Sequence, residues 1–412
     1  MRVGLQCSLS DPHLDVAQPN SQRQLSMAIS AIVDQPGRSA PLNLCLVLDH
    51  SGSMQGTPLS QVKEAANRIV ESLSPSDRLS IVVFDHKAKV LIPNAPVADP
   101  IEVKSKLYSL KASGGTCIDD GLKLGIEECA KGKQDTISQI FLLTDGENEH
   151  GDDLRCLKLA ELAADYTITL NSLGFGDHWN QDVLERIADA GSGSLTYIQE
   201  PENAIAEFSR LFTRIQSVGL TNAYLSIQLS DAARLAELKP IAQVAPETIE
   251  LSVIQEANQV LVRLGDLMVD APRVVLANLY IHQLPPGAHP IATVQVRYDD
   301  PALGQTELTS ESIRVEVTGQ AQYQATPNPH VQQHVLALAK YRQTQIAETK
   351  LQSGDRQGAV TLLQSAAKTA LQMGDQNAAT VLQENATRLQ SGEALSERDR
   401  KQTRIASKTT LQ

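Results

Sequence analysis

The chain has 412 residues, a hydrophobic fraction of 42% and a formal net charge of −12. At roughly 100–200 residues per domain, this length predicts about two or three domains, and the hydrophobic fraction excludes a chain that is disordered throughout. The excess of acidic residues argues against a general nucleic-acid binder, which should carry a basic face.

Residues 1–40 are predicted to be extended, with short apolar-rich runs at Val3–Ser8 and Gln24–Ile32. From Leu42 to about Ile215, apolar runs alternate with amphipathic helical patterns, which predicts a doubly wound, mostly parallel α/β sheet covered by helices on both faces. The predicted strands are Leu42–Leu48, Leu79–Phe84, Ile137–Leu143 and Thr167–Leu173. The predicted helices begin at Pro58 and near Ala98, Ile118 and Asp152, followed by Gln181–Ala190 and Asn203–Ser217.

From Thr221 to Thr318, apolar and polar residues alternate along the chain, a pattern typical of an antiparallel β-sandwich. This region and residues 1–40 both adjoin the α/β unit in sequence. We therefore expect an α/β domain, residues 41–219, inserted into a sandwich formed by residues 1–40 and 220–320. The alternative is that the N-terminal strands pair with the α/β sheet itself.

The sequence after Pro329 is helical and contains an internal repeat. The segment Leu351–Asp355 returns as Leu371–Asp375, each with a glycine placed to end one helix and an aspartate placed to begin the next. This predicts an α-helical bundle over residues 327–395, similar to tetratricopeptide-type hairpins. Residues 396–412 carry basic side chains with little apolar content, which predicts a basic, flexible tail.

Polar residues gather where predicted strands and loops should meet. The buried strand Leu42–Leu48 ends in Asp49, and Ser51 and Ser53 follow. The loop Ser113–Thr116 offers the hydroxyl of Thr116 before a helix, and Asp145 follows another buried strand. In open α/β sheets, the loops at the carboxyl ends of the strands line the binding crevice. Oxygen ligands of this kind suit a hard cation, Mg²⁺ first, with Mn²⁺ and Ca²⁺ as alternatives.

The three loops together resemble a von Willebrand factor A-type domain with a complete metal-ion-dependent adhesion site. The resemblance covers about residues 42–217 and is supported by Lys63 in the helix after the first loop and by Leu173-Gly174-Phe175-Gly176 at a later strand end. It implies that Ser51, Ser53 and Thr116 coordinate the cation through hydroxyls, while Asp49 and Asp145 contact it directly or through water. The partner implied is a protein that presents an aspartate or glutamate to the cation.

The sequence shows no phosphate-binding loop, no nucleophile elbow and no zinc-protease motif. We therefore expect a non-enzymatic, metal-dependent interaction scaffold. Two alternatives stay open: an assembly cofactor of an AAA-type ATPase or metal-insertion machine, and a structural protein that self-associates through the metal. The N-terminus lacks the apolar run of a signal peptide, and no apolar stretch of about 18 residues predicts a transmembrane segment, so we expect a cytoplasmic location.

Overall fold

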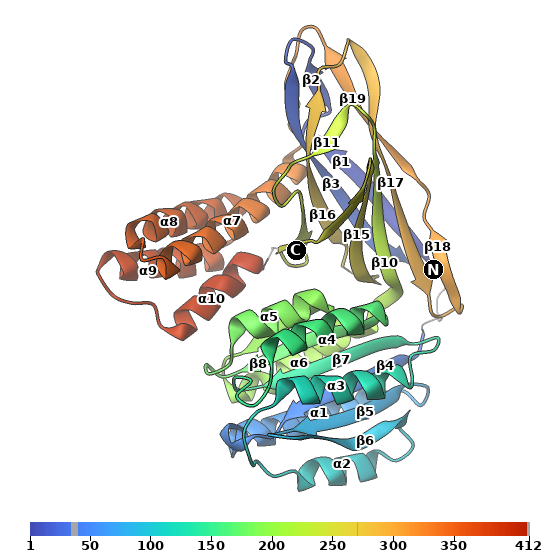
Figure 1. The fold of residues 1–412 in the computed structure, drawn as a ribbon, viewed down its shortest axis with the longest axis vertical. Helices are drawn as coiled ribbons and strands as arrows, with labels where there is room; N and C mark the ends of the chain where they lie inside the picture. Colours follow the sequence, from blue (N-terminus) through green and yellow to red (C-terminus); the bar gives the residue numbers. More distant parts are fainter. Residues whose placement is uncertain (34–39, 270, 410–412) are drawn as a thin grey trace.

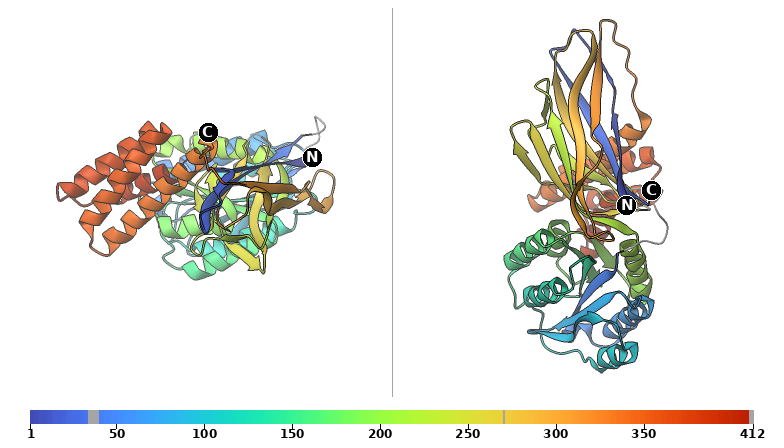
Figure 2. Two further views of the ribbon diagram at one scale, coloured as in Figure 1. Left: turned by 90° about the horizontal axis from the view of Figure 1, so that it is seen from above. Right: turned by 90° about the vertical axis from the view of Figure 1, so that its right-hand side faces the viewer.

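The computed structural model describes residues 1–33, 40–269 and 271–409. The described chain forms a β-sandwich at one end, an α/β domain at the other, and a helical domain beside them (Figure 1). Figure 2 shows the helical domain projecting to one side of the long axis. Residues 34–39 of the predicted N-terminal segment and 410–412 of the predicted tail lie outside the described residues. Among the described residues, no helix combines the length and the apolar character needed to cross a membrane.

The α/β domain is built on a mostly parallel sheet with the strand order β6-β5-β4-β7-β8-β9. Strands β4, β7 and β8 are buried along their whole length, because helices cover both faces of the sheet. The strands are β4 (Leu42–Asp49), β5 (Arg78–Phe84), β6 (Ala88–Pro96), β7 (Ile137–Thr144), β8 (Ile168–Phe175) and β9 (Ser192–Ile198). The helices are α1 (Thr57–Ser72), α2 (Pro100–Ser109), α3 (Ile118–Ala130), α4 (Asp153–Asp165), α5 (Gln181–Ala190) and α6 (Ala204–Gln216), with short 3₁₀ turns η1 (Gly52–Met54) and η2 (Pro201–Asn203).

The edge strands β6 and β9 are the part of this sheet that the sequence patterns do not predict. Strand β6 runs antiparallel to β5, contains Pro93 and Pro96, and is largely exposed. Strand β9 begins with Ser-Gly-Ser, residues that have low β-propensity. An edge strand does not need a continuous apolar run, so the signal that identifies the central strands is missing here.

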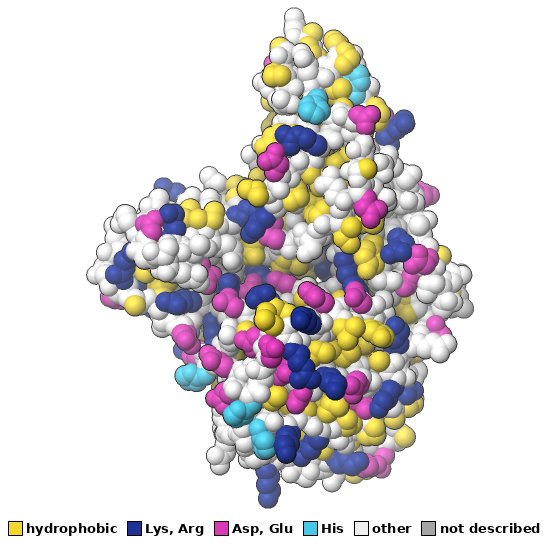
Figure 3. Space-filling view, in the orientation of Figure 1, with side chains coloured by type: hydrophobic (Ala, Val, Ile, Leu, Met, Phe, Trp, Pro, Cys, Tyr) yellow, Lys and Arg dark blue, Asp and Glu magenta, His cyan; other side chains and the backbone are white. Residues whose placement is uncertain are grey.

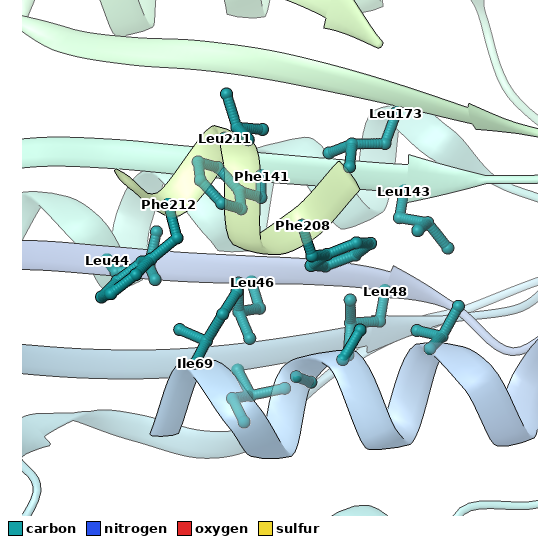
Figure 4. Close-up of a cluster of buried hydrophobic side chains, with 14 of the residues drawn as sticks. Leu44, Leu46, Leu48, Ile69, Phe141, Leu143, Leu173, Phe208, Leu211 and Phe212 are labelled. Atoms are coloured by element: carbon teal, nitrogen blue, oxygen red, sulfur yellow. The ribbon is translucent and has the colours of Figure 1, made fainter. Parts of the chain in front are cut away.

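Alternate residues of β4 pack against opposite helical layers. Leu44, Leu46 and Leu48 face α1 and α6 in a shared apolar cluster, which Figure 4 shows in close-up. Val47 faces the other side, toward residues of α3, α4 and α5. The rings of Phe141 on β7 and Phe208 on α6 meet edge to face, with their centroids 6.4 Å apart. The central strands are therefore held from both sides, which fixes the position of their carboxyl ends.

The sandwich consists of two mostly antiparallel sheets. One has the order β1-β3-β16-β12-β13 with β11 against β16, and the other has the order β14-β15-β10-β17-β19-β2 with β18 against β17. Because β3 pairs with β16, the N-terminal strands belong to the sandwich and not to the α/β sheet. The bounds are β1 (Arg2–Leu9), β2 (His13–Asp15), β3 (Asn20–Ile32), β10 (Val218–Leu229), β11 (Ala233–Leu235), β12 (Ile241–Ala245), β13 (Ile249–Glu250), β14 (Val253–Glu256), β15 (Gln259–Met268), β16 (Arg273–His282), β17 (Gly287–Asp300), β18 (Gln305–Thr309) and β19 (Ile313–Gln320).

The helical domain contains α7 (Pro329–Gln352), α8 (Arg356–Met373), α9 (Gln376–Gln390) and α10 (Glu397–Lys408). Helix α8 ends at Met373 and is capped by Gly374, which adopts the left-handed conformation with φ of 81°. Asp355 and Asp375 accept backbone hydrogen bonds at the starts of α8 and α9. The predicted fold class is confirmed: a doubly wound α/β domain inserted into a β-sandwich, followed by a helical bundle.

The prediction of a flexible tail after residue 396 is wrong, because residues 397–408 form helix α10 and dock on α5. The ammonium group of Lys408 lies 2.5 Å from a carboxylate oxygen of Glu185 and 3.3 Å from Asp189. Arg404 lies 3.2 Å from the other carboxylate oxygen of Glu185. Burial alone would lower the pKa of Lys408, but these carboxylates raise it above its ordinary value. A run of basic residues is usually solvated, which is why the sequence predicted a free end. The acidic partners of these residues lie about 220 residues earlier in the chain and are not visible in the local sequence.

A buried polar network joins the sandwich to the amino ends of the α/β strands. The carboxylate of Asp266 on β15 accepts hydrogen bonds from Gln139 on β7 (2.6 Å) and from Thr169 on β8 (2.7 Å). The guanidinium of Arg273 donates to the backbone carbonyl of Asp266 (2.7 Å) and to Gln243 (2.6 Å). Burial raises the pKa of Asp266, so its ionised form depends on these donors. The network fixes the α/β domain against the sandwich.

We expect Asp266→Ala to lower the free energy of unfolding by about 2–4 kcal/mol, because it leaves the buried donors of Gln139 and Thr169 without an acceptor. Urea unfolding followed by circular dichroism measures the change. The matched control is Asp165→Ala, which removes an ion pair of 3.0 Å between the Asp165 carboxylate and the Arg263 guanidinium at the same junction. The side chain of Asp165 is 74% exposed, so this ion pair is open to solvent. That control should change the stability by less than about 1 kcal/mol. Equal effects of the two variants would contradict a structural role for the buried network.

We expect Lys408→Ala to lower the free energy of unfolding by about 3 kcal/mol, because Glu185 and Asp189 lose a buried cation. Lys368→Ala, which removes an exposed lysine of α8, serves as the control and should have little effect. The same urea experiment compares the two. A stability of Lys408→Ala equal to that of the control would show that α10 is only loosely attached.

Candidate metal centre

The predicted ligands come from three loops at the carboxyl edge of the parallel sheet. Strands β4 and β7 pair in parallel with Leu48 opposite Leu143, so Asp49 and Thr144 end neighbouring strands. Ser51 and Ser53 lie in the turn after β4, and Asp145 directly follows β7. Thr116 lies in the loop before α3. The parallel topology thus brings residues that are far apart in the sequence to one edge.

Hydrogen bonds connect four of the five predicted ligands. Asp49 accepts from the backbone amide of Ser51 (2.7 Å) and from the hydroxyl of Thr144 (2.5 Å). The hydroxyl oxygens of Ser51 and Ser53 lie 3.0 Å apart, and the Ser53 hydroxyl donates to the carboxylate of Asp145 (2.6 Å). In an octahedral site with Mg–O distances of about 2.1 Å, neighbouring ligand oxygens lie about 3.0 Å apart. The distance between the Ser51 and Ser53 hydroxyls therefore equals that of adjacent ligands, and the hydrogen bond from Ser53 to Asp145 is shorter than that spacing.

Thr116 is placed beside this group by close contacts of the backbone. A Cβ atom added to Gly146 would lie 3.3 Å from the Thr116 hydroxyl and 4.0 Å from the Ser53 hydroxyl, so both hydroxyls face the backbone after Asp145. The amide of Gly52 donates to the carbonyl of Gly114 (3.0 Å), which joins the first loop to the second. Gly114 has a φ of 73°, a conformation that favours glycine.

The electrostatics of the site fit a cation. Burial raises the pKa of Asp49 to about 6, although hydrogen bonds from Thr144 and Ser51 lower it, and the neighbouring Asp145 raises it further. Burial also raises the pKa of Asp145. Across the described residues, neither carboxylate forms an ion pair with a lysine or arginine. Two carboxylates and three hydroxyls without a basic partner are the oxygen donors that a hard divalent cation prefers.

A nearby acidic group has a different explanation. Cys117, Asp119 and Asp120 lie close together at the start of α3. Arg155 on α4 donates to Asp119 (2.7 Å) and to Asp120 (3.0 Å), so these carboxylates have a cationic partner. Burial raises the pKa of the Cys117 thiol to about 11, which keeps it protonated at neutral pH. This group links α3 to α4.

The C-terminal helix contributes to the rim of the site, a contact that the sequence does not predict. The ammonium group of Lys401 on α10 donates to the carbonyls of Asp177 (2.6 Å) and Trp179 (2.9 Å), in the loop between β8 and α5. It also lies 4.1 Å from the centroid of the Trp179 ring. Between these carbonyls is His178, whose positive charge would lower the pKa of Asp145. A lysine more than 200 residues away gives no local signal of this contact.

Histidines are a further feature of this edge that the sequence did not reveal as a group. His86, His150 and His178 are exposed on separate loops around the carboxyl ends of the strands. The space-filling view in Figure 3 shows histidine side chains gathered at the lower left of the α/β domain. His50, between Asp49 and Ser51, is instead buried, and its Nδ1 lies 3.1 Å from the carbonyl of Lys111.

Comparisons with known proteins agree with this architecture. The family model of the von Willebrand factor type A domain matches residues 43–211. The family model described as the Sll0103-like, C-terminal alpha-helical domain matches residues 329–412. The protein sll0103 of Synechocystis sp. is 59% identical over 412 residues, which cover 100% of this chain and 98% of that protein.

Solved structures show the same fold over nearly the whole length. A von Willebrand factor type A protein from Catenulispora acidiphila aligns with a TM-score of 0.82 at 17% identity, covering 99% of this chain and 97% of its own. The ArnB paralog VWA2 from Sulfolobus acidocaldarius aligns with a TM-score of 0.61 at 16% identity, with the same coverage of 99% and 97%. Because it is 59% identical to sll0103 over its whole length, the chain belongs to the same, Sll0103-like family. In this chain a von Willebrand factor type A domain is combined with the C-terminal helical domain.

Proposed function

We propose that the protein is a non-enzymatic, divalent-cation-dependent scaffold for protein–protein interaction. In this proposal Asp49, Ser51, Ser53, Thr116 and Asp145 hold a cation, which binds an aspartate or glutamate of a partner protein. The observation that carries the proposal is the pair of unneutralised carboxylates, joined to hydroxyls that have the spacing of adjacent octahedral ligands. Von Willebrand factor type A domains typically mediate protein–protein interaction, which supports the same class of function.

The ligand types explain why such a cation would bind a partner's acid. Hydroxyl oxygens are neutral, so three of the five proposed ligands bring no charge to the cation, and a carboxylate that contacts it through water would neutralise it less than a direct ligand. Mg²⁺ prefers six oxygens and usually retains water molecules, one of which an incoming carboxylate can replace. Mg²⁺ is our first choice, and Mn²⁺ and Ca²⁺ are the alternatives. The net gain from the carboxylate is reduced by the cost of removing it from water.

The first test is direct binding of the metal. We expect wild type to bind Mg²⁺ in isothermal titration calorimetry, and Mn²⁺ in a parallel titration followed by electron paramagnetic resonance. The double variant Asp49→Ala with Ser51→Ala should bind at least tenfold more weakly, because it loses one charged and one neutral ligand. A tenfold change corresponds to about 1.4 kcal/mol.

The control for the metal titration is Asp165→Ala, an exposed acid at the C-terminal end of α4. It should bind Mg²⁺ like wild type. Circular dichroism of the double variant shows whether its fold is retained. Equal Mg²⁺ affinity of a folded double variant and wild type would remove these residues from the metal site.

The second test is capture of a partner. We expect wild type immobilised in Mg²⁺ to retain a protein from the native lysate that is released by EDTA and is absent with the folded Asp49→Ala, Ser51→Ala variant. Mass spectrometry then identifies it. An AAA-type ATPase would favour an assembly cofactor, and a second copy of this chain would favour metal-dependent self-association. Capture that is unaffected by EDTA would show that the interaction does not depend on the metal.

A further inference from the structure

We propose that a pocket beside the metal centre binds a second acidic side chain of the same partner, so that the protein recognises a segment with two acids. This inference rests on the proposed function and extends it from a single carboxylate to a diacidic sequence. It is based on the position of the pocket, on the reach of a peptide between the two sites, and on the lysines that line it.

The pocket has a volume of about 430 Å³ and lies between the start of α1 and the segment that follows α2. Gln55, Gly56 and Lys63 line one side. Tyr108, Lys111 and Ala112 line the other. Both sides continue directly into loops of the metal centre, because Gln55 follows Ser53 by two residues and Ala112 precedes the loop that carries Thr116.

Backbone contacts fix the second side of the pocket against the metal loop. The carbonyl of Lys111 lies 3.1 Å from Nδ1 of His50, which stands between Asp49 and Ser51. The amide of Ser113 donates to the carbonyl of His50 (2.8 Å). The pocket and the metal ligands therefore belong to one rigid arrangement of loops.

The separation of the two sites suits a short peptide. Gln55 and Gly56 are two and three residues from Ser53, so their Cα atoms lie within roughly 7–11 Å of the Ser53 Cα. An extended peptide advances by roughly 3.3 Å per residue. A residue two or three positions from the metal-bound acid therefore reaches the pocket.

The charge of the pocket selects an anionic side chain. Lys111 is exposed, and within the residues that the structure describes its ammonium group has no ion pair. Lys63 donates to the carbonyls of Leu110 (2.5 Å) and Tyr108 (3.2 Å), so its ammonium group is already bound by backbone acceptors. The nearby acid Glu64 accepts a hydrogen bond from the Tyr108 hydroxyl (2.9 Å) and lies 3.6 Å from Arg68. Glu64 thus has partners of its own, and Lys111 remains available to a ligand.

The experiment compares two immobilised heptapeptides by biolayer interferometry in Mg²⁺. One has two glutamates separated by one glycine, and the other has glutamine in place of the second glutamate. We expect wild type to bind the diacidic peptide about three- to tenfold more tightly than the monoacidic one, because an additional ion pair forms at a partly exposed site. EDTA should abolish binding of both peptides.

The variant Lys111→Gln should bind the two peptides equally while retaining the affinity of wild type for the monoacidic peptide. Lys111→Glu should bind the diacidic peptide less tightly than the monoacidic one. Lys158→Gln, which changes an exposed lysine on α4 in the opposite helical layer, is the control and should keep the preference of wild type.

The outcomes separate this inference from the proposed function. Mg²⁺-dependent binding of both peptides with equal affinity by wild type would overturn the pocket proposal and leave the metal-dependent capture of an acid standing. A preference for the diacidic peptide that persists in Lys111→Gln would also overturn it. If neither peptide binds to wild type, this result would count against both proposals.

Discussion

The burial of carboxylates at one edge of the parallel sheet is the constraint on which the candidate site depends. Asp49 is fully buried, and the groups that contact it and Asp145 are hydroxyls and backbone amides. An ionised carboxylate that is removed from water requires opposite charge or hydrogen bonds to compensate for its lost hydration. Burial and the neighbouring Asp145 raise the pKa of Asp49 to about 6 against the opposing effect of its hydrogen bonds from Thr144 and Ser51. A divalent cation would supply the missing positive charge, which is the physical basis of the proposed function.

The surrounding backbone places the hydroxyls before any ligand arrives. The loop of Ser53 is joined to that of Thr116 through the Gly52–Gly114 hydrogen bond, and the amide of His150 donates to the carbonyl of Thr116 (3.0 Å). The strands beneath these loops are fixed by packed helices on both faces. Because the oxygens already lie close together, little of the binding free energy of a cation would be spent on ordering the loops. The parallel sheet therefore restricts the geometry of the candidate site and also carries the residues that we propose as ligands.

The sequence predicted the parts of the fold whose signals are local. The buried strands β4, β7 and β8 are continuous apolar runs, and the residues proposed as ligands follow or adjoin the ends of elements that such runs identify. The edge strand β6 lacked a run of this kind, because one of its faces is open to solvent. Helix α10 was predicted to be a flexible tail, because its local sequence is basic and has little apolar content. The acids of α5 that pair with Arg404 and Lys408 are distant in the sequence, so this docking has no local signal. The pocket at Lys111 was missed for the same reason, since it is formed by two segments that become neighbours only on folding.

The packing of the other domains determines which face of the α/β domain a partner can approach. The sandwich meets the amino ends of the strands, where Asp266 contacts Gln139 and Thr169. Helix α10 covers one side of the carboxyl edge, where Lys401 binds the carbonyls of Asp177 and Trp179. On the side formed by the start of α1 and the segment after α2, Gln55, Gly56 and Lys111 are exposed, and the helical domain lies away from α2 (Figure 1). A peptide bound to the proposed cation would therefore extend toward the open side, which is where the Lys111 pocket lies.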